Sequence, residues 1–365
     1  MGTASSTVRL PLVKKAIAVA IQAGEPVLVW GEPGVGKSSG IKAICSALDL
    51  PLEVVIGSIR EATDIGGLPI RAGSGVRLLP PDWALRAARR DRTAVFFDEI
   101  TTAPSDVQAA MLAVVLDRVV GDLQLPDGVA FVAAANPPSS GGIRPLSAPL
   151  ANRFCHLTWA LDPHDWANGT AVGWPKEPIV EVPTDRSASL GRWTQLTTSF
   201  IRHRPDLLMA TAETDRSMAW PSPRSWSQAL RLAAAAEAAG TDEDVRHTLV
   251  SGCVGVGPAM EFHSFVRSLD LTDPAVALAD PDLVAIPESA DRCHALLQSV
   301  ATLVAQSNSE RDWRSAWRLV GRIADQRGAD VAVTTAMQLA RLRRAEWSPP
   351  QEVDRFRPVL VGINS

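Results

Sequence analysis

The stretch WGEPGVGKSS, residues 30–39, decides the fold of this 365-residue chain. It fits the phosphate-binding pattern G-x-x-x-x-G-K-[ST], with Gly31, Gly36, Lys37 and Ser38 at the fixed positions. Glycines let the backbone curl so that N–H groups point at anionic oxygens, and a following helix adds its free N–H groups. Lys37 is expected on the terminal phosphates and Ser38 on Mg²⁺. The residues predicted to hold the phosphates are Gly31, Glu32, Pro33, Gly34, Val35, Gly36, Lys37, Ser38 and Ser39.

The flanks of this stretch match the context that the pattern needs. Residues 26–30, PVLVW, form a short apolar run typical of a strand, and residues 37–48 carry apolar side chains at helical spacing. The competing interpretation is a structural turn between a strand and a helix. Strand, loop and helix in this order favour the phosphate site.

Further strands and helices alternate through the first half of the chain. Apolar runs predict strands over 52–56, 93–100, 129–136 and 154–161, helices over 12–23, 82–91, 105–117 and 148–154, and hairpins over 67–80 and 118–128. Continuous apolar strands separated by helices indicate a parallel sheet covered on both faces. The expected fold class is therefore an α/β phosphate-loop core.

The pattern changes after about residue 162. A connector rich in Pro, Gly and Trp is followed only by helical patterns, with N-caps expected at Ser225 and Ser309. We expect an α/β core over 1–165, a linker over 166–192, a helical lid and extension over 193–347, and a tail over 348–365. In that tail, PVLVGI is a candidate edge strand.

Two acids close the apolar strand in AVFFDEI, residues 94–100. An acid at the carboxyl end of such a strand lies beside the phosphate loop. Asp98 is expected to hold Mg²⁺ and Glu99 to activate the attacking water. Alternatively, both acids cap the helix that follows. Two adjacent carboxylates are costly to bury without a cation, which favours the site.

Three more polar residues are candidates for the same site. Asn136 ends the next apolar strand and would hydrogen-bond the water or the γ-phosphate, although a turn residue before Pro137 is the alternative. Arg153 follows a short helix and would stabilise transition-state charge in a neighbouring subunit. Arg224 begins a later helix and would reach the γ-phosphate when the domains close. The alternatives are a surface ion pair for Arg153 and an exposed side chain for Arg224.

Taken together, these residues resemble the AAA+ ATPases. Residues 31–38 match Walker A, Asp98 and Glu99 match Walker B, Asn136 matches sensor 1, Arg153 the arginine finger and Arg224 sensor 2. The phrases ATDIGGLP, ANPP, PLANRF and SPRSW resemble the MoxR branch, and the resemblance covers about residues 8–270.

The resemblance implies an ATP-driven, Mg²⁺-dependent ring, usually a hexamer, with a C-terminal helical lid and active sites between subunits. It also implies a chaperone-like action on a partner protein, which in this branch is often a metalloenzyme or a protein with a von Willebrand factor A domain. The expected pore-side segments, 65–75 and 121–128, hold no aromatic residue, which favours a push on a docked partner, or a local disassembly, over processive threading.

Composition removes several other classes of function. The net charge is −4, so nucleic acid is not an expected partner, although Arg86, Arg89, Arg90 and Arg92 leave a nucleic-acid-linked NTPase as an alternative. No run is apolar enough to span a membrane, and four scattered cysteines indicate reduced thiols in the cytoplasm. There is no G-x-S-x-G sequence for a serine hydrolase. A nucleotide-gated binding module with slow turnover also stays open.

Overall fold

The computed structural model describes residues 10–137, 145–174, 177, 180–210, 216–268 and 273–360. The chain divides into two compact units. The first unit comprises Met1–Arg186 and Leu207–Met260, and the second comprises Ser187–Asp206 and Glu261–Ser365. The sheet and every predicted site residue lie in the first unit.

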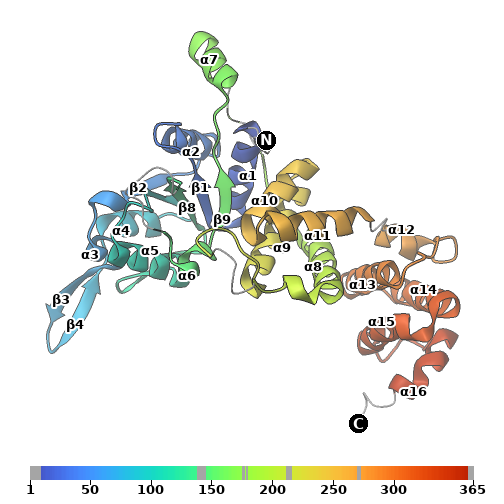
Figure 1. The fold of residues 1–365 in the computed structure, drawn as a ribbon. Helices are drawn as coiled ribbons and strands as arrows, with labels where there is room; N and C mark the ends of the chain where they lie inside the picture. The colour runs from blue at the N-terminus through green and yellow to red at the C-terminus, as the bar shows by residue number, and fades with distance from the viewer. Residues whose placement is uncertain are drawn as a thin grey trace. The chain divides into compact units, whose positions relative to one another are not determined.

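A five-stranded parallel sheet forms the centre of the first unit (Figure 1). Its strands follow the order β2-β5-β8-β1-β9, and each neighbouring pair is parallel. The strands are β1 (Val27–Trp30), β2 (Leu52–Ile56), β5 (Thr93–Asp98), β8 (Val129–Ala135) and β9 (Cys155–Thr158). The predicted parallel α/β core is confirmed.

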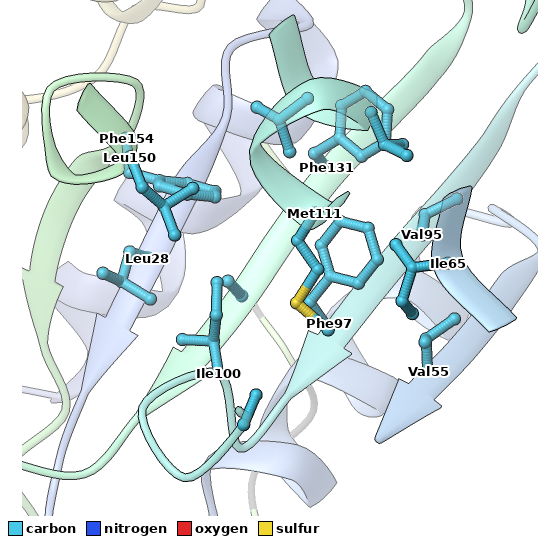
Figure 2. Close-up of a cluster of buried hydrophobic side chains, with 14 of the residues drawn as sticks. Leu28, Val55, Ile65, Val95, Phe97, Ile100, Met111, Phe131, Leu150 and Phe154 are labelled. Atoms are coloured by element: carbon cyan, nitrogen blue, oxygen red, sulfur yellow. The ribbon is translucent and has the colours of Figure 1, made fainter. Parts of the chain in front are cut away.

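One face of the sheet packs against four helices. These are α3 (Ala62–Gly66), α4 (Asp82–Ala88), α5 (Ser105–Asp117) and α6 (Ala148–Ala151). Figure 2 shows the resulting core, in which Phe97 of β5 and Phe131 of β8 stack with centroids 6.1 Å apart. Met111 of α5 and Leu150 of α6 are fully buried against this layer. Burying these side chains stabilises the sheet by roughly 1.5–3 kcal/mol each.

Helices from both ends of the unit pack on the opposite side. Helix α1 (Leu10–Ala23) packs on β1, β8 and β9, beside α2 (Lys37–Ala47), while α9 (Pro223–Ala238) and α10 (Glu243–Val254) pack on α1. Helix α10 also lies on β9. A Cβ atom at Gly252 would come within 2.6 Å of the His156 carbonyl oxygen, so this close approach requires glycine. Two of the predicted lid helices thus belong to the same unit as the sheet.

Both predicted hairpins are present. They are β3 (Leu68–Ala72) with β4 (Gly75–Leu79), and β6 (Val119–Val120) with β7 (Leu123–Gln124). A short 3₁₀ turn, η1 (Gly57–Ile59), follows β2.

The second unit is helical and has a core of its own. Trp313 and Trp317 are fully buried there with Trp347 and Phe356, and the Trp313 Nε1 atom donates to the Leu339 carbonyl at 2.8 Å. Its elements are α8 (Ser187–His203), most of α11 (Val256–Ser268), α12 (Pro274–Ala279), α13 (Ala290–Ser307), α14 (Glu310–Arg327), α15 (Ala329–Arg341), η4 (Gln351–Phe356) and α16 (Arg357–Leu360); η3 (Pro205–Leu207) lies at the boundary between the units.

Two expectations about irregular segments are wrong. The connector after residue 162 contains α7 (Pro163–Val172), which Asp162 caps by accepting from the His164 and Asp165 backbone N–H groups. Helix α8 begins before the predicted end of the linker. Arg357–Leu360 is helical rather than an edge strand, and residues 361–363 lie outside the described residues. The predicted functional boundaries of the domains remain predictions.

Candidate functional site

The carboxyl ends of three neighbouring strands bring the predicted polar residues together. Trp30 of β1 pairs in register with Ala135 of β8, so Gly31 and Asn136 leave the sheet side by side. The Gly31 N–H group donates to the Ala135 carbonyl at 3.1 Å. Asp98 ends β5, the strand on the other side of β8. Chain topology alone therefore assembles the site.

The phosphate loop between β1 and α2 has the backbone that its glycines allow. Gly34 and Gly36 have φ angles of +80° and +90°, a left-handed region that disfavours other residues. Helix α2 begins at Lys37, directly after the loop. Its free N–H groups and positive dipole end make this helix start suited to phosphate.

Lys37 is nearly buried at the base of the loop, with 8% of its surface exposed. Its Nζ atom donates to the Gly31 carbonyl at 2.5 Å and to the Asn136 Oδ1 atom at 2.9 Å. Burial lowers the pKa of the Lys37 ammonium from its ordinary value, while nearby Asp98, first among three carboxylates, raises it. A phosphate oxygen would therefore meet a desolvated cation that is already held in place.

Ser38 and Asp98 form a direct oxygen pair. The Ser38 Oγ atom donates to the Asp98 Oδ2 atom at 2.7 Å. Hydroxyl and carboxylate oxygens are the hard ligands that Mg²⁺ prefers, usually together with substrate phosphates and waters. No group of three or more His, Cys, Asp or Glu side chains suited to a metal occurs among the described residues. The Ser38–Asp98 pair fits a Mg²⁺ ion that arrives with a nucleotide, because phosphates and waters would supply the other ligands.

Glu99 sits in a backbone conformation that is uncommon for its residue type. Its φ angle is +57°, and its N–H group donates to the Asp98 Oδ1 atom at 3.0 Å. The Ser58 hydroxyl, from the turn after β2, donates to the Glu99 Oε2 atom. Such strained residues concentrate at functional sites, where surrounding contacts hold them.

A cavity of about 330 Å³ joins these groups. It is lined by Pro33, Gly34, Gly36, Lys37, Ser38, Ser39, Asp98, Glu99, Ala134 and Asn136. All of these except Ala134 are predicted site residues. The arrangement places an ammonium, a hydroxyl, two carboxylates and an amide around one space, which suits binding and hydrolysis of a triphosphate.

The two predicted arginines do not line this cavity. Arg153 follows α6 and is half-buried, and its buried Nε atom has no hydrogen-bond partner among the described residues. Arg224 is exposed at the second position of α9. Helices α6 and α9 are tied together, because the Ser222 hydroxyl donates to the Asn152 Oδ1 atom at 2.8 Å. The Gln228 side chain also donates to the Arg153 carbonyl at 3.2 Å.

Sequence reasoning missed residues that support the site. Ser58 holds Glu99, and the Thr101 Oγ1 atom accepts from the Asn136 backbone N–H group at 3.2 Å. The Trp159 indole donates to the Val35 carbonyl of the phosphate loop at 3.2 Å. Ser58 and Trp159 both follow strands of the sheet. The criterion that identified Asn136, its position just after such a strand, therefore applies to them too. Thr101 lies in a loop and has no comparable signal.

A family model matches the segment that holds all the predicted site residues except Arg224. Residues 26–154 match the family model of the AAA domain, dynein-related subfamily. Midasin from Giardia intestinalis is 27% identical over 150 residues, which are 39% of this chain and 3% of that protein. The uncharacterized protein YehL from Escherichia coli is 28% identical over 160 residues, which are 40% of this chain and 44% of that protein.

The match to these relatives is partial. The chain spans less than half the length of either curated relative. A solved structure of a proposed ATPase from Cytophaga hutchinsonii is 16% identical with a TM-score of 0.45, and it covers 72% of this chain and 89% of that one. The comparisons support an AAA domain and do not confirm the MoxR branch, which stays a prediction.

Within the described residues, no helix has the length and apolar character needed to cross a membrane.

Proposed function

We propose that this chain, whose residues 26–154 form an AAA domain on an AAA+ α/β core, hydrolyses ATP with the help of Mg²⁺. The observation that carries the proposal is the single cavity in which Lys37 meets Asn136 and Ser38 meets Asp98. These are the contacts that ATP phosphates and their cation would replace. A structural turn needs neither a buried ammonium nor a paired carboxylate.

Each group has a distinct role in this proposal. Lys37 moves its donors from Asn136 to the phosphates, which frees the Asn136 amide for the water or the γ-phosphate. When bound, Mg²⁺, held by Ser38 and Asp98, would neutralise charge on the phosphate oxygens. Glu99 orients the attacking water and takes its proton, with Ser58 fixing the carboxylate. The phosphate-loop N–H groups stabilise the anionic oxygens.

The site is completed by a second copy of the chain. Arg153 lies outside the cavity of its own chain, which is consistent with a role in a neighbour. Arg224 is exposed in the same unit and would reach the phosphates only if α9 moved. We therefore propose a ring, in MoxR-like proteins usually a hexamer, in which turnover depends on assembly.

The work of the ring is directed at a partner protein that is not identified, with a von Willebrand factor A domain protein as the MoxR-like candidate. The hairpin of β3 and β4 supports a protein-facing role, because it exposes apolar side chains on a two-stranded ribbon. Val76 is 71% exposed and Leu68 52% exposed. Such patches mark interaction surfaces in soluble proteins.

The nucleic-acid alternative loses part of its basis. Within the basic cluster on and just after α4, the Arg86 Nη2 atom lies 2.8 Å from the Glu53 Oε2 atom, and the Arg90 Nη1 atom lies 3.7 Å from the Glu53 Oε1 atom. These two arginines serve an ion pair on β2 and are not free for phosphate. A net charge of −4 gives no compensating attraction.

The proposal is tested by melting temperature and mass, with and without Mg²⁺-ATP. A ligand that binds only the folded state adds about 2.7 kcal/mol to the free energy of unfolding when its concentration is 100 times its Kd, and the melting temperature rises as a result. We expect a higher melting temperature and a larger assembly for the wild type, and neither for Lys37→Ala. Lys42→Ala, exposed on the same helix, is the matched control. No response of the wild type at saturating ATP would overturn the proposal.

A further inference from the structure

We propose that Lys14 and Glu177 read the edge of the nucleotide base and require an N–H donor on it. This inference rests on the proposed function, since it presumes phosphates in the cavity described above. It adds a specificity-determining pair from two segments that no sequence motif covers. The ligand class is a purine nucleotide whose base carries an N–H donor on its Watson–Crick edge.

A second cavity adjoins the phosphate cavity. Its volume is about 430 Å³, and it shares Gly34, Gly36 and Ser39 with the lining of the first. A nucleotide with its phosphates on the loop would extend its sugar and base into this space. The size suits a nucleoside, since ligand pockets start at roughly 300 Å³.

Three indole rings line the second cavity, from Trp159, Trp166 and Trp174. Trp159 is fixed by its hydrogen bond to the Val35 carbonyl and by its contact with Gly40, where a Cβ atom would lie 2.0 Å from the ring. Trp166 and Trp174 are about half exposed, at 53% and 54%. A planar base that stacks on such rings covers their apolar surface, and this kind of stacking accepts any base.

One polar pair interrupts this aromatic lining. The Lys14 Nζ atom lies 2.6 Å from the Glu177 Oε1 atom, and both side chains are only 13% exposed. The Glu177 Oε2 atom is buried and has no hydrogen-bond partner within the part of the chain that the structure describes. A buried carboxylate oxygen without a donor is costly, so the cavity favours a ligand that brings an N–H group to it.

The pair presents an acceptor beside a donor. Adenine has the complementary order in its N6–H and N1 atoms, and guanine has it in its N1–H and O6 atoms. Purine riboside, which lacks the exocyclic amino group, offers the N1 acceptor but no N–H donor. The Glu177 Oε2 atom would stay unpaired against it. The three bases have similar areas for stacking, so differences in their affinity report the hydrogen bonds at the Watson–Crick edge.

The test is equilibrium binding of ADP, GDP, purine riboside diphosphate and pyrophosphate to the full chain, measured by calorimetry with Mg²⁺. Diphosphates avoid turnover. We expect ADP, GDP or both to bind about tenfold or more tightly than purine riboside diphosphate, as for one hydrogen bond to a charged group. The better of the two names the purine.

Glu177→Gln sharpens the test. With its amide oxygen on Lys14, the variant places an amide N–H group where the Oε2 atom was, so donor faces donor. The preference over purine riboside diphosphate should then fall to about onefold. Lys15→Met is the matched control, because Lys15 pairs with exposed Asp242 at 3.3 Å and does not line the cavity. It should keep the wild-type preference.

Two outcomes would overturn the inference and leave the proposed function intact. One is equal binding of all three nucleotides to the wild type, which needs no variant to fold. The other is an unchanged preference in a folded Glu177→Gln protein. If neither the nucleotides nor pyrophosphate bind, the proposed function fails with it.

Discussion

The carboxyl edge of the sheet and the paired helices α6 and α9 both carry predicted site residues, but they differ in readiness. At the sheet edge, Lys37 already contacts Asn136, and Ser38 contacts Asp98, within one chain. At the helices, Arg153 and Arg224 lie outside the cavity that those residues line. The difference teaches that strand topology brings the sheet-edge residues together within one chain, while the proposed roles of the two arginines require a second chain or a movement of α9.

The largest expected effect comes from removing the cation at the sheet edge. In Lys37→Ala, the phosphates lose a buried ammonium, so nucleotide binding and turnover should both fall below detection. Calorimetry and phosphate release measure the two quantities. Lys42→Ala should behave as the wild type, because its side chain is exposed on the same helix. Tight binding by Lys37→Ala would mean that the cavity is not the phosphate site.

Arg153→Ala tests the other side of the comparison. Arginines that stabilise transition-state charge are worth about 10³–10⁵ in rate, so turnover should fall by at least about 10³ while nucleotide affinity is kept. Arg224→Ala should weaken turnover in the same direction. A folded Arg153→Ala assembly with wild-type turnover would leave the residue a structural role only.

Glu99→Gln removes the proposed general base and leaves the size of the side chain unchanged. General-base catalysis contributes about 10²–10⁴ in rate, so ATP should bind and persist unhydrolysed. Asp106→Asn, exposed in the first turn of α5, is the control. Undiminished phosphate release would remove Glu99 from the mechanism.

His156 contacts both β1 of the sheet and helix α6, and its burial is expected to make the free energy of unfolding depend on pH. Its Nδ1 atom accepts from Trp30 Nε1 at 2.9 Å, and its Nε2 atom contacts the Ala151 carbonyl at 2.8 Å. Burial lowers the pKa of His156 to about 4 from 6.5. The folded state therefore favours the neutral ring. The contribution of this ring to the free energy of unfolding is fully present above pH 6.5. That contribution falls as the pH drops from 6.5 towards 4, by about 3 kcal/mol in total.

Urea unfolding of wild type and His156→Gln between pH 7 and pH 4.5 measures this term. The difference in unfolding free energy between the two proteins should shrink as the pH falls. His164→Gln, an exposed histidine, should leave the wild-type pH dependence unchanged. A constant difference across the range would show that His156 is not held neutral.

The smallest expected effect is at the link between α6 and α9. Ser222→Ala removes the N-cap of α9 and leaves the buried Asn152 Oδ1 atom without its donor. We expect a loss of about 1–2 kcal/mol in the unfolding free energy, read by urea denaturation. Ser227→Ala, whose exposed hydroxyl only bonds back to Pro223, should change it little. An equal loss in both variants would contradict the role of the link.

Much of the first unit was predictable because its signals are local. Apolar runs marked every strand of the sheet, and the phosphate-loop pattern marked the loop and the start of α2. Parallel strands then bring Gly31, Asp98 and Asn136 to one edge without further information. The predicted N-cap Ser309 is confirmed for α14, where its side chain accepts from the Asp312 N–H group.

The remainder depends on contacts between distant residues. Ser225 was expected as the N-cap of α9, but Ser222 takes that place because Pro223 is acceptable at the first helical position. Asp162 starts α7 inside a segment whose prolines and glycines indicate a linker. The pair of Lys14 and Glu177 joins residues 163 positions apart, and no local pattern announces it.

The most direct test of the central claim mixes two inactive proteins. Arg153→Ala keeps an intact phosphate site and an intact Glu99, and Glu99→Gln keeps ATP binding and an intact Arg153. If two copies build each site, mixed assemblies should regain turnover at about a quarter of their interfaces. Phosphate release by the one-to-one mixture, compared with each variant alone, measures it. The predicted result is recovery of phosphate release. A shared site would be contradicted if the mixture has formed mixed assemblies, as shown by their mass, and is still as inactive as each variant alone.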